Sequence, residues 1–412
     1  MKKFLLIAVV ALFLVWASVS GGLIGRITGA TSSNLLVAAS SAETGAAATQ
    51  GTSDSASASV LSASGGSALD TTDLFTERDL EQTVDVSEAE SIALLSGEDV
   101  AISQEGVYLL SGTVTDVTIT VDAGEDAKVQ LVLDGVSVTN ENAPAIYVAS
   151  ADKVFITLTD SANQLEVSGN FETDSLDSVI ISRSDLTLNG VGSLEIISAN
   201  ANGITSNDDL KITGGTYTIN AASDGLKAND SIRIYAGTFT ITAGKDALHS
   251  ENNEDSSLGY IYLYNASLEI AAGDDGIQGN AIVQIDGGTI AINTSSEGIE
   301  STYVQVNGGV INIYATDDGI NAAQKSAYDV LLEINGGTIT IDMASGDTDA
   351  LDSNGGMVIN GGILNITANS AFDYNVTGTL NGGTVTVNGQ AVTQLTPSQG
   401  GGAGKMGRHG GI

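Results

Sequence analysis

The chain repeats a short turn motif, and this repeat limits the possible folds more than any other feature. Residues 273–280 read Gly-Asp-Asp-Gly-Ile-Gln-Gly-Asn, and close variants precede and follow them. The Gly or Ala of each turn falls at Gly203, Gly225, Ala247, Gly276, Gly298, Gly319, Ala350 and Ala371. Successive positions lie 22, 22, 29, 22, 21, 31 and 21 residues apart. Such a period predicts a solenoid in which each repeat forms one coil.

Each repeat also contains a second turn, usually a Gly-Gly pair, which a short alternating run follows. Residues 338–341, Thr-Ile-Thr-Ile, come directly after Gly336-Gly337, and the alternation is typical of a half-buried strand. Each repeat therefore reads turn, strand, turn, strand. Residues 85–200 alternate in the same way with less regular spacing. The sequence predicts an all-β parallel solenoid with coils of about 22 residues.

Composition divides the chain into five expected segments. Met1-Lys2-Lys3, an apolar run and small residues have the pattern of a secretory signal, with an uncleaved anchor as the alternative. In both cases the rest of the chain is expected to be extracellular, secreted or tethered to the cell surface. The expected segments are 1–24, signal or N-terminal anchor; 25–72, flexible Ser/Ala/Thr-rich linker; 73–200, N-terminal cap and first coils; 201–390, regular coils; and 391–412, a disordered Gly-rich tail.

Charge and cysteine content exclude several classes of partner. The chain has 50 acidic and 14 basic residues, a net charge of −36, and no Cys. This balance argues against nucleic acid and against anionic membranes, so a membrane contact is expected only through the N-terminal anchor. Without Cys there is no disulfide framework, and stability must come from stacking and from metal. The chain is expected to be a monomer. Its excess of acidic residues has two interpretations: it keeps the protein soluble, or it binds cations.

Stacking the repeats brings equivalent residues to within about 4.8 Å of each other. One position after each turn Gly or Ala stands an aliphatic or aromatic residue, which predicts an interior ladder. Three positions after it the residues are nearly all small, as a tight inward corner requires. One position before it stand six consecutive acids: Asp224, Asp246, Asp275, Glu297, Asp318 and Asp349.

The row of acids predicts cation binding along one edge. Carboxylates about 5 Å apart repel by about 3 kcal/mol at an effective dielectric of about 20. Oxygen ligands without Cys or His clusters favour Ca²⁺. For any single Asp the alternative is turn chemistry, because Asp-Gly is a favourable turn pair. The candidate ligands are Asp224, Asp246, Asp274, Asp275, Glu297, Asp317, Asp318, Asp349 and Asp352.

A second candidate surface lies on the strands before the Gly-Gly turns. Tyr260, Tyr262 and Tyr264 alternate with aliphatic residues and so face one side. Rings flanked by polar groups suit a sugar chain, since a pyranose has apolar faces and hydroxyl edges. Ordinary aromatic stacking along a solenoid is the alternative. The candidate carbohydrate-binding residues are Tyr235, Tyr260, Tyr262, Tyr264, Arg233 and Gln284.

Together these motifs resemble those of a known family. Asp134-Gly135, the run 208–215 and the turn 273–277 resemble the bacterial extracellular carbohydrate-binding family built on a right-handed parallel β-helix, over about residues 75–390. The resemblance implies a pectate-lyase-like right-handed parallel β-helix, bound calcium, and non-catalytic binding of plant-type polysaccharides, including cellulose and acidic sugars. The Asp-Gly turn of the family matches Asp224, Asp246, Asp275, Asp318 and Asp349. Asn202-Gly203 and Ser370-Ala371 lack the acid, which weakens a metal site at both ends of the row.

We therefore expect an extracellular protein that binds plant-type polysaccharide, cellulose or an acidic sugar such as polygalacturonate, with calcium along the acidic turns. One alternative is a calcium-dependent pectate-type lyase, which needs a Lys or Arg base beside the metal. The basic residues expected near the acidic edge are Lys211, Lys227, Arg233 and Lys245. The second alternative is a cell-surface adhesin or structural spacer.

Overall fold

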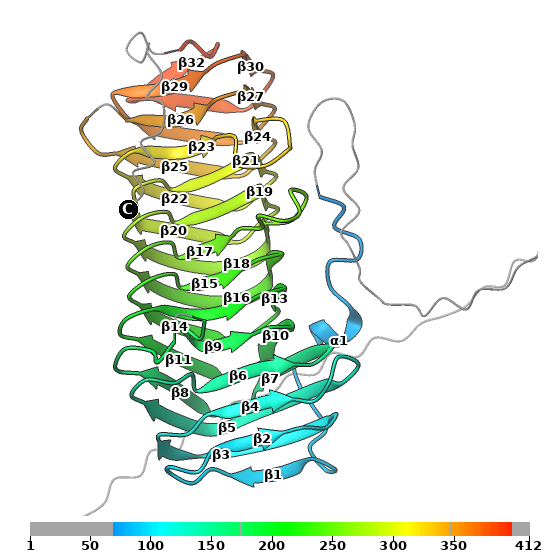
Figure 1. Cartoon of the computed structure of the whole chain (residues 1–412). Coiled ribbons are helices and arrows are strands. Elements are labelled where there is room, and N and C mark those ends of the chain that lie inside the picture. The colour runs from blue at the N-terminus through cyan, green and yellow to red at the C-terminus, as the bar shows by residue number, and fades with distance from the viewer. Residues whose placement is uncertain (1–68, 174, 347, 398–412) are drawn as a thin grey trace, which may run out of the picture. The chain divides into compact units, whose positions relative to one another are not determined.

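Parallel strands stack in register along nearly the whole described chain (Figure 1). The computed structural model describes residues 69–173, 175–346 and 348–397, all within the unit Ala56–Ile412. The strands form a parallel β-solenoid of about 12 turns with a spacing of ~24 residues, which confirms the predicted fold class. The expected signal or anchor, most of the linker and residues 398–412 lie outside the described residues.

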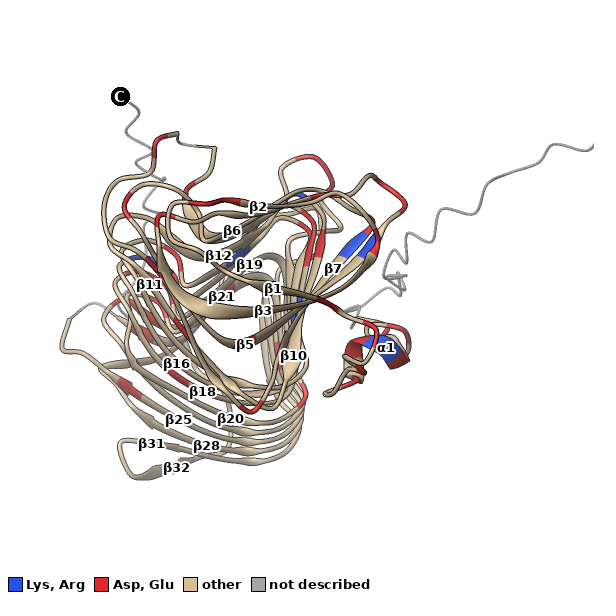
Figure 2. Cartoon of the chain, turned by 90° about the horizontal axis from the view of Figure 1, so that it is seen from below, with Lys and Arg blue, Asp and Glu red and all other residues tan. Residues whose placement is uncertain are grey.

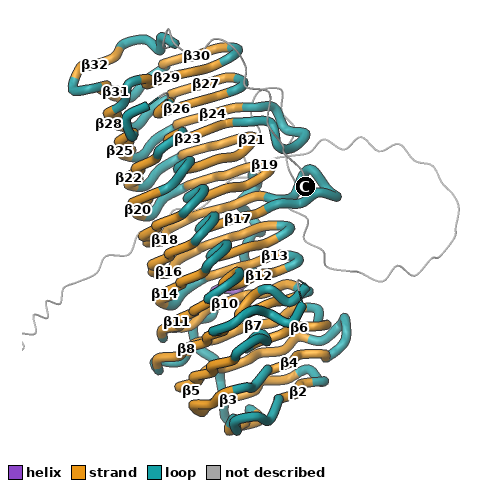
Figure 3. The backbone as a smooth tube through the Cα atoms, turned by 60° about the vertical axis from the view of Figure 1, so that its left-hand side comes forward, coloured by secondary structure: helices purple, strands orange, loops and turns teal. Residues whose placement is uncertain are grey.

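Three stacks of strands enclose the core, as the view along the solenoid shows (Figure 2), and within each stack the strands follow one another coil upon coil (Figure 3). Sheet 1 contains β1 (Glu90–Ala93), β3 (Gly106–Thr115), β5 (Lys128–Asn140), β7 (Lys153–Leu158), β10 (Asp185–Gly190), β13 (Asp209–Ile212), β16 (Ser231–Ala243), β18 (Tyr260–Ala272), β19 (Ile277–Ile285), β21 (Ile299–Val306), β24 (Leu331–Ile334), β27 (Gly356–Ile359) and β30 (Thr377–Leu380).

Sheet 2 follows sheet 1 along each coil. It contains the second halves of β3, β5, β16 and β18, together with β8 (Ala162–Val167), β11 (Ser193–Ser198), β14 (Thr216–Ala221), β20 (Thr289–Thr294), β22 (Val310–Ala315), β25 (Thr338–Met343), β28 (Ile363–Thr367) and β31 (Thr384–Val387). The antiparallel strand β32 (Gln390–Val392) pairs with β31. Leu395 is buried behind it, so ordered structure extends past the expected start of the tail at 391.

Sheet 3 carries the turn motif at its start. It contains β2 (Val100–Ile102), β4 (Ile119–Asp122), β6 (Ile146–Ser150), β9 (Ser178–Ser182), β12 (Asn202–Ser206), β15 (Leu226–Ala228), β17 (Leu248–Ser250), the first halves of β19 and β21, β23 (Asp318–Ala322), β26 (Asp349–Ser353) and β29 (Ser370–Tyr374). The expectation of two strands per coil was therefore incomplete, because the residues after each turn motif form a third short strand.

The predicted interior ladder is confirmed coil by coil. Each member pairs with the next in register: Ile204, Leu226, Leu248, Ile277, Ile299, Ile320, Leu351 and Phe372. All of them are buried, and the ladder continues towards the N-terminus through Ile180, Ile146 and Ile119. Removing these side chains from water supplies much of the stability of a solenoid, at about 25 cal/mol for each Å² of apolar surface.

The Gly-Gly turns join sheet 1 to sheet 2, and their second Gly has a left-handed backbone. Its φ lies between 83° and 94° at Gly215, Gly288, Gly309, Gly337, Gly362 and Gly383. A side chain is disfavoured there, both because of this φ and because adjacent coils approach closely. A Cβ at Gly288 would lie 2.3 Å from the carbonyl oxygen of Ala266 in the preceding coil.

Residues 69–82, the N-terminal strap, lie against the outside of sheet 1 and include α1 (Glu77–Leu80), the only helix in the described residues (Figure 1). Thr76 caps α1, since its Oγ1 accepts the N–H of Asp79 while the Asp79 carboxylate accepts the N–H of Thr76. Leu69, which falls at the end of the expected linker, is buried together with Leu74, so that end of the linker is packed on the solenoid. No helix among the described residues is long and apolar enough to cross a membrane.

Candidate functional site

The predicted row of acids exists, and its carboxylates are tied into the solenoid backbone. Asp246 Oδ1 accepts the N–H of Asp275 at 2.9 Å, and Asp275 Oδ1 accepts the N–H of Glu297 at 3.3 Å. Asp224 and Asp318 make the equivalent bonds to the following coils. We call this row, together with the next outward row on sheet 3, the acidic edge. The structural role expected of Asp is present, but it links neighbouring coils instead of closing one turn.

Asn202 shows that this bond does not require a negative charge. Its Oδ1 accepts the N–H of Asp224 at 3.1 Å, in the same geometry as the acids above it. An amide therefore suffices for the structural bond. The acids at the equivalent positions of the later coils therefore carry a negative charge that the hydrogen bond between coils does not require.

Two groups of acids in the middle of the edge converge. Asp246, Asp274 and Asp275 form one group, and Asp275, Glu297 and Glu300 form the other, with the ligand oxygens in each group within 4.8 Å of one another. Glu300 belongs to the outward row, in register with Gln278. Hard oxygens at this spacing fit the ligand preference of Ca²⁺, so these five residues would hold it.

Burial and mutual repulsion make the central carboxyls weak acids. Burial, then the charges of Glu300 and Asp246, raises the pKa of Asp275 to about 8. Burial, then the charges of Glu300 and Asp275, raises the pKa of Glu297 to about 9. Without a cation this pair therefore retains a proton at neutral pH, and a bound cation would replace it.

The N-terminal end of the edge provides its own cations instead. His249 Nδ1 lies 3.1 Å from Asp246 Oδ2 and 3.5 Å from Asp224 Oδ2, and Lys227 Nζ lies 3.4 Å from Asp224 Oδ2. Burial alone would lower the pKa of His249, but the bonds and charges of Asp224 and Asp246 outweigh it and raise that pKa to about 9. The His249 imidazolium thus already neutralises much of the charge at Asp224 and Asp246.

The C-terminal members of the edge are less closely grouped. Burial, then the charge of Asp352, raises the pKa of Asp318 to about 7, and burial, then Asp373, raises that of Asp352 to about 6. No group of three described ligand atoms within 4.8 Å includes Asp317, Asp318, Asp349 or Asp352. Both groups that consist of acids alone include Asp275, and a third group within the same distance joins Asp224, Asp246 and His249.

A polar pocket lies on sheet 3 next to the N-terminal end of the acidic edge. It has a volume of about 380 Å³, and its lining includes Arg183, Lys227, Asn207, Asn229 and Asp177. The pocket therefore offers cationic and amide donors a short distance along the sheet from the carboxylates. Acidic and basic groups meet in one continuous surface.

The predicted sugar-binding strip on sheet 1 has a different environment from the one expected. Its side chains do point out of the solenoid, but the N-terminal strap covers most of them. Tyr260, Tyr262, Arg233 and Gln284 are 0%, 4%, 3% and 3% exposed, so the expectation that they are open to a ligand is wrong. Tyr264 remains 44% exposed, with its ring stacked 4.8 Å from that of the partly buried Tyr235.

The basic residues proposed to serve the acidic edge lie on two different faces. Lys211 and Arg233 belong to sheet 1 and lie beneath the strap, so their expected place near the edge is wrong. Only Lys227 among the basic residues expected there makes a described ion pair with an acid of the edge. Strand alternation identified outward residues, but it did not distinguish the sheets to which they belong.

The sequence predicted Lys227 near the edge, but it did not predict the contacts that two other cations, Lys325 and His249, make there. Lys325 Nζ lies 2.6 Å from Glu300 Oε2, and Gln278 Nε2 donates to both Asp275 and Glu300 at 2.8 Å. Lys325 comes from an inserted loop, and the 31-residue interval before Ala350 is the signal that marks it. His249 was assigned to the outward row, but its contact with two acids of the adjacent row was not foreseen.

The fold and the acidic edge define a β-solenoid with a charged surface, and comparison with known proteins gives the family. Residues 96–350 match the model described as "Carbohydrate-binding domain-containing protein", and the chain belongs to this family. A relative of the same description from Acetivibrio thermocellus is 42% identical over 212 residues, 50% of this chain and 74% of the relative. The solved structure of a polysaccharide lyase-like protein from C. thermocellum, a gadolinium derivative, shares 27% identity at a TM-score of 0.40 and covers 71% of this chain and 95% of that one.

Proposed function

We propose that this protein is an extracellular polysaccharide-binding protein that takes acidic plant-type chains such as polygalacturonate, with cellulose as a further ligand, and holds Ca²⁺ at the acidic edge. The observation that carries the proposal is the convergence of Asp275, Glu297 and Glu300 within 4.8 Å on the sheet that also bears the Arg183–Lys227 pocket. Membership of a carbohydrate-binding family supports the ligand class.

The chemistry of this surface suits a uronate chain. A calcium ion at the edge would supply open coordination positions for ligand carboxylates. Arg183 is exposed and can pair with a carboxylate in bidentate fashion, while Asn207 and Asn229 can donate to hydroxyls. A neutral cellulose chain would instead use the exposed Tyr264 ring on sheet 1, a different face from the pocket on sheet 3.

Calorimetric titration with hexagalacturonate and cellohexaose, in calcium and in chelator, tests the proposal. We expect hexagalacturonate to bind in calcium and to lose at least about tenfold in affinity in chelator, equivalent to about 1.4 kcal/mol. Asp275→Asn combined with Glu297→Gln should abolish the effect of calcium. Asp342→Asn is the matched control, because Asp342 is an exposed acid on sheet 2. Equal affinity with and without calcium would reject the role of the metal.

A pectate-type lyase is the second candidate, because Lys227 borders the pocket and contacts the acidic edge. A base at this place could remove the proton next to a uronate carboxylate. Polygalacturonate incubated with protein and calcium would then gain ultraviolet absorbance from an unsaturated product, and Lys227→Met would remove the gain. No gain in the unmodified protein rejects the lyase and leaves binding.

The remaining expectations concern the setting of the protein. We propose a monomer at the outside of the cell, supported by the acidic composition and the N-terminal signal pattern. Light scattering of the purified chain and fractionation of the producing cells test both points. If neither saccharide binds in any condition, the adhesin or spacer becomes the better interpretation.

A further inference from the structure

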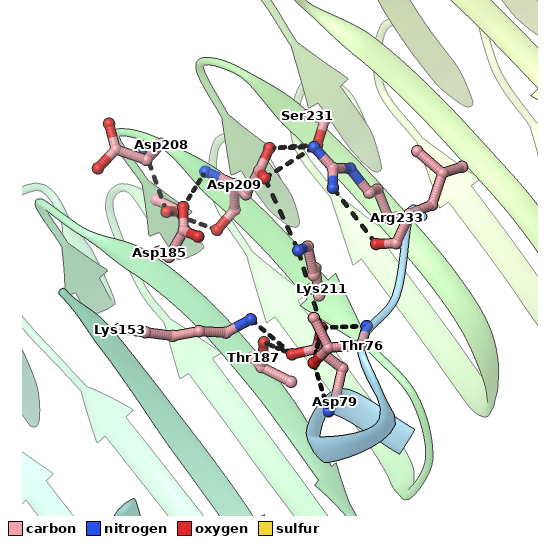
Figure 4. A network of polar contacts seen from close by, with 12 residues as sticks. Thr76, Asp79, Lys153, Asp185, Thr187, Asp208, Asp209, Lys211, Ser231 and Arg233 are labelled. Atoms are coloured by element: carbon pink, nitrogen blue, oxygen red, sulfur yellow. Dashed lines mark hydrogen bonds and ion pairs between the residues drawn. The ribbon is translucent and has the colours of Figure 1, made fainter. Parts of the chain in front are cut away.

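A second charged surface, on sheet 1, is covered by the chain itself. The N-terminal strap brings the Asp79 carboxylate between Lys153 and Lys211 (Figure 4). Asp79 is fully buried, with Oδ1 2.5 Å from Lys153 Nζ and 3.1 Å from Thr187 Oγ1, and Oδ2 3.8 Å from Lys211 Nζ. This surface differs from the acidic edge, because it brings three cations, Lys153, Lys211 and Arg233, together on a chain of net charge −36. Asp209 is the solenoid carboxylate that contacts two of them, Lys211 and Arg233.

The other half of the strap makes aromatic and apolar contacts. The ring of Phe75 lies 5.4 Å from that of Tyr235, edge to face, and 6.3 Å from that of Tyr262. Leu69 and Leu74 join an apolar cluster with Tyr260 and Tyr262 that is separate from the solenoid core. The strap thus combines a carboxylate on two lysines with a ring beside two tyrosines.

Outward side chains of the solenoid make most of the polar contacts with the strap. Gln284 Oε1 accepts the N–H of Leu69 at 2.9 Å, and Arg233 donates to the carbonyl oxygen of Leu74 at 3.3 Å. Among the described backbone-to-backbone bonds, the strap pairs only with itself. The strap could therefore leave without breaking a bond of the sheet ladder.

The cations beneath the strap need an anion. Burial, then the charges of Arg233 and Lys153, lowers the pKa of Lys211, so these groups repel one another when no carboxylate lies between them. Asp209 lies 2.7 Å from Arg233 and 3.9 Å from Lys211, whereas Asp79 contacts both lysines. Removing Asp79 takes from Lys153 its described ion-pair partner and leaves Lys211 with Asp209, and a ligand carboxylate would restore the lost contact.

We propose that the strap occupies a second polysaccharide-binding site as an internal substitute for an acidic sugar chain, and that a uronate polymer displaces it. Lys153, Lys211 and Thr187 bind the ligand carboxylate in place of Asp79, and Tyr235 and Tyr262 face the sugar rings in place of Phe75. This inference rests on the proposed function for its ligand class, but it concerns another sheet and involves no metal.

The test uses the full chain in chelator, so that calcium-dependent binding at the acidic edge does not contribute. Asp79→Asn weakens the strap, and Glu77→Gln is the matched control, because Glu77 is an exposed acid on the same helix. While the strap covers the site, the apparent affinity equals the intrinsic affinity multiplied by the fraction of molecules whose strap has left. We expect Asp79→Asn to bind hexagalacturonate at least about tenfold more tightly than Glu77→Gln or the unmodified chain. Adding Lys211→Met should remove the gain.

Hydrogen exchange of the unmodified chain gives a second readout that needs no substitution. The N–H groups of Leu69 and Leu80 are bonded when the strap is in place, and they should lose protection as hexagalacturonate is added in chelator. The proposal is supported by this loss of protection. It is also supported by a gain in affinity in Asp79→Asn that disappears when Lys211→Met is added. Unchanged protection at high ligand together with equal affinity of the two variants overturns it. An equal gain for neutral cellohexaose overturns the assignment of a carboxylated ligand.

Discussion

Replacing Asp275 by Asn should change stability in opposite directions depending on calcium. Without metal, Asp275 and Glu297 retain a proton in the folded state that ordinary carboxyls in the unfolded chain release near pH 4. Because these folded-state pKa values are raised, the associated stability is present at low pH and is lost as pH rises through them. For one shared proton, stability falls by about 1.4 kcal/mol for each pH unit between about pH 5 and 8.

The magnitude follows from that slope. Over three pH units the loss is at most about 4 kcal/mol, or about 5 °C in melting temperature for a chain of this size. Asn at position 275 removes the charge, while its Oδ1 can still accept the N–H of Glu297, as Asn202 does for Asp224. We therefore expect Asp275→Asn to melt higher than the unmodified protein in chelator at pH 8.

Calcium should reverse this order, because the substitution removes a ligand that the metal would use. Calorimetry of both proteins at pH 5 and pH 8, in chelator and in calcium, gives the difference in melting temperature between them in each of the four conditions. Asp342→Asn again controls for the loss of one exposed acid. The reasoning is refuted if the metal-free protein is equally stable at pH 5 and 8, or if Asp275→Asn melts lower in chelator at pH 8.

Three further predictions concern single side chains. Against the effect of burial, Asp224 and Asp246 raise the pKa of His249 to about 9, above its ordinary 6.5, so the stability that it adds is complete below about pH 6.5 and is lost as pH rises through 9. His249→Gln should therefore lower the free energy of unfolding in urea by about 3 kcal/mol at pH 6 and by little at pH 9.5. Equal losses of stability at the two pH values would contradict the pairing of His249 with these acids. Gly288→Ala should lower stability by about 2 kcal/mol or more, because its Cβ would meet a backbone oxygen, while Gly389→Ala, with similar φ and open space, should cost about 1 kcal/mol. Tyr264→Ala should weaken cellohexaose binding about fivefold with little change in melting temperature, and unchanged binding would remove the Tyr264–Tyr235 pair from the site.

The sequence could predict the solenoid because its information is periodic. In a parallel stack each residue meets its equivalent in the next coil, so spacing alone placed Ile277 beside Leu248 and Ile299. The same logic placed Asp246, Asp275 and Glu297 in one row. Periodicity gives contacts between equivalent positions, and the structure keeps that register across the longer intervals of 29 and 31 residues.

The contacts that periodicity missed join residues that are not equivalent. Leu69 bonds Gln284 across 215 residues, and Asp79 bonds Thr187 across 108. Nothing in the composition of residues 69–82 marks them as a segment that packs on sheet 1. Lys325 likewise reaches Glu300 from a loop outside the repeat. Such contacts depend on the direction in which an irregular segment leaves the solenoid, and spacing does not encode that direction.

Parallel stacking itself explains why this fold needs charge compensation. Any charged residue that is repeated in every coil comes within about 5 Å of its own copies, and burial strengthens the repulsion. Figure 2 shows acidic residues recurring along the coils, and this chain relieves the repulsion in distinct ways. Asn202 replaces the acid by an amide, and His249 and Lys325 provide local cations. Asp79 returns from the strap to neutralise Lys153 and Lys211 (Figure 4). Asp275 and Glu297 have none of these as direct partners among the described ion pairs, and their raised pKa values record the repulsion that is left. An external cation is therefore needed most at that point of the solenoid, and an external anion can compete most directly at the strap.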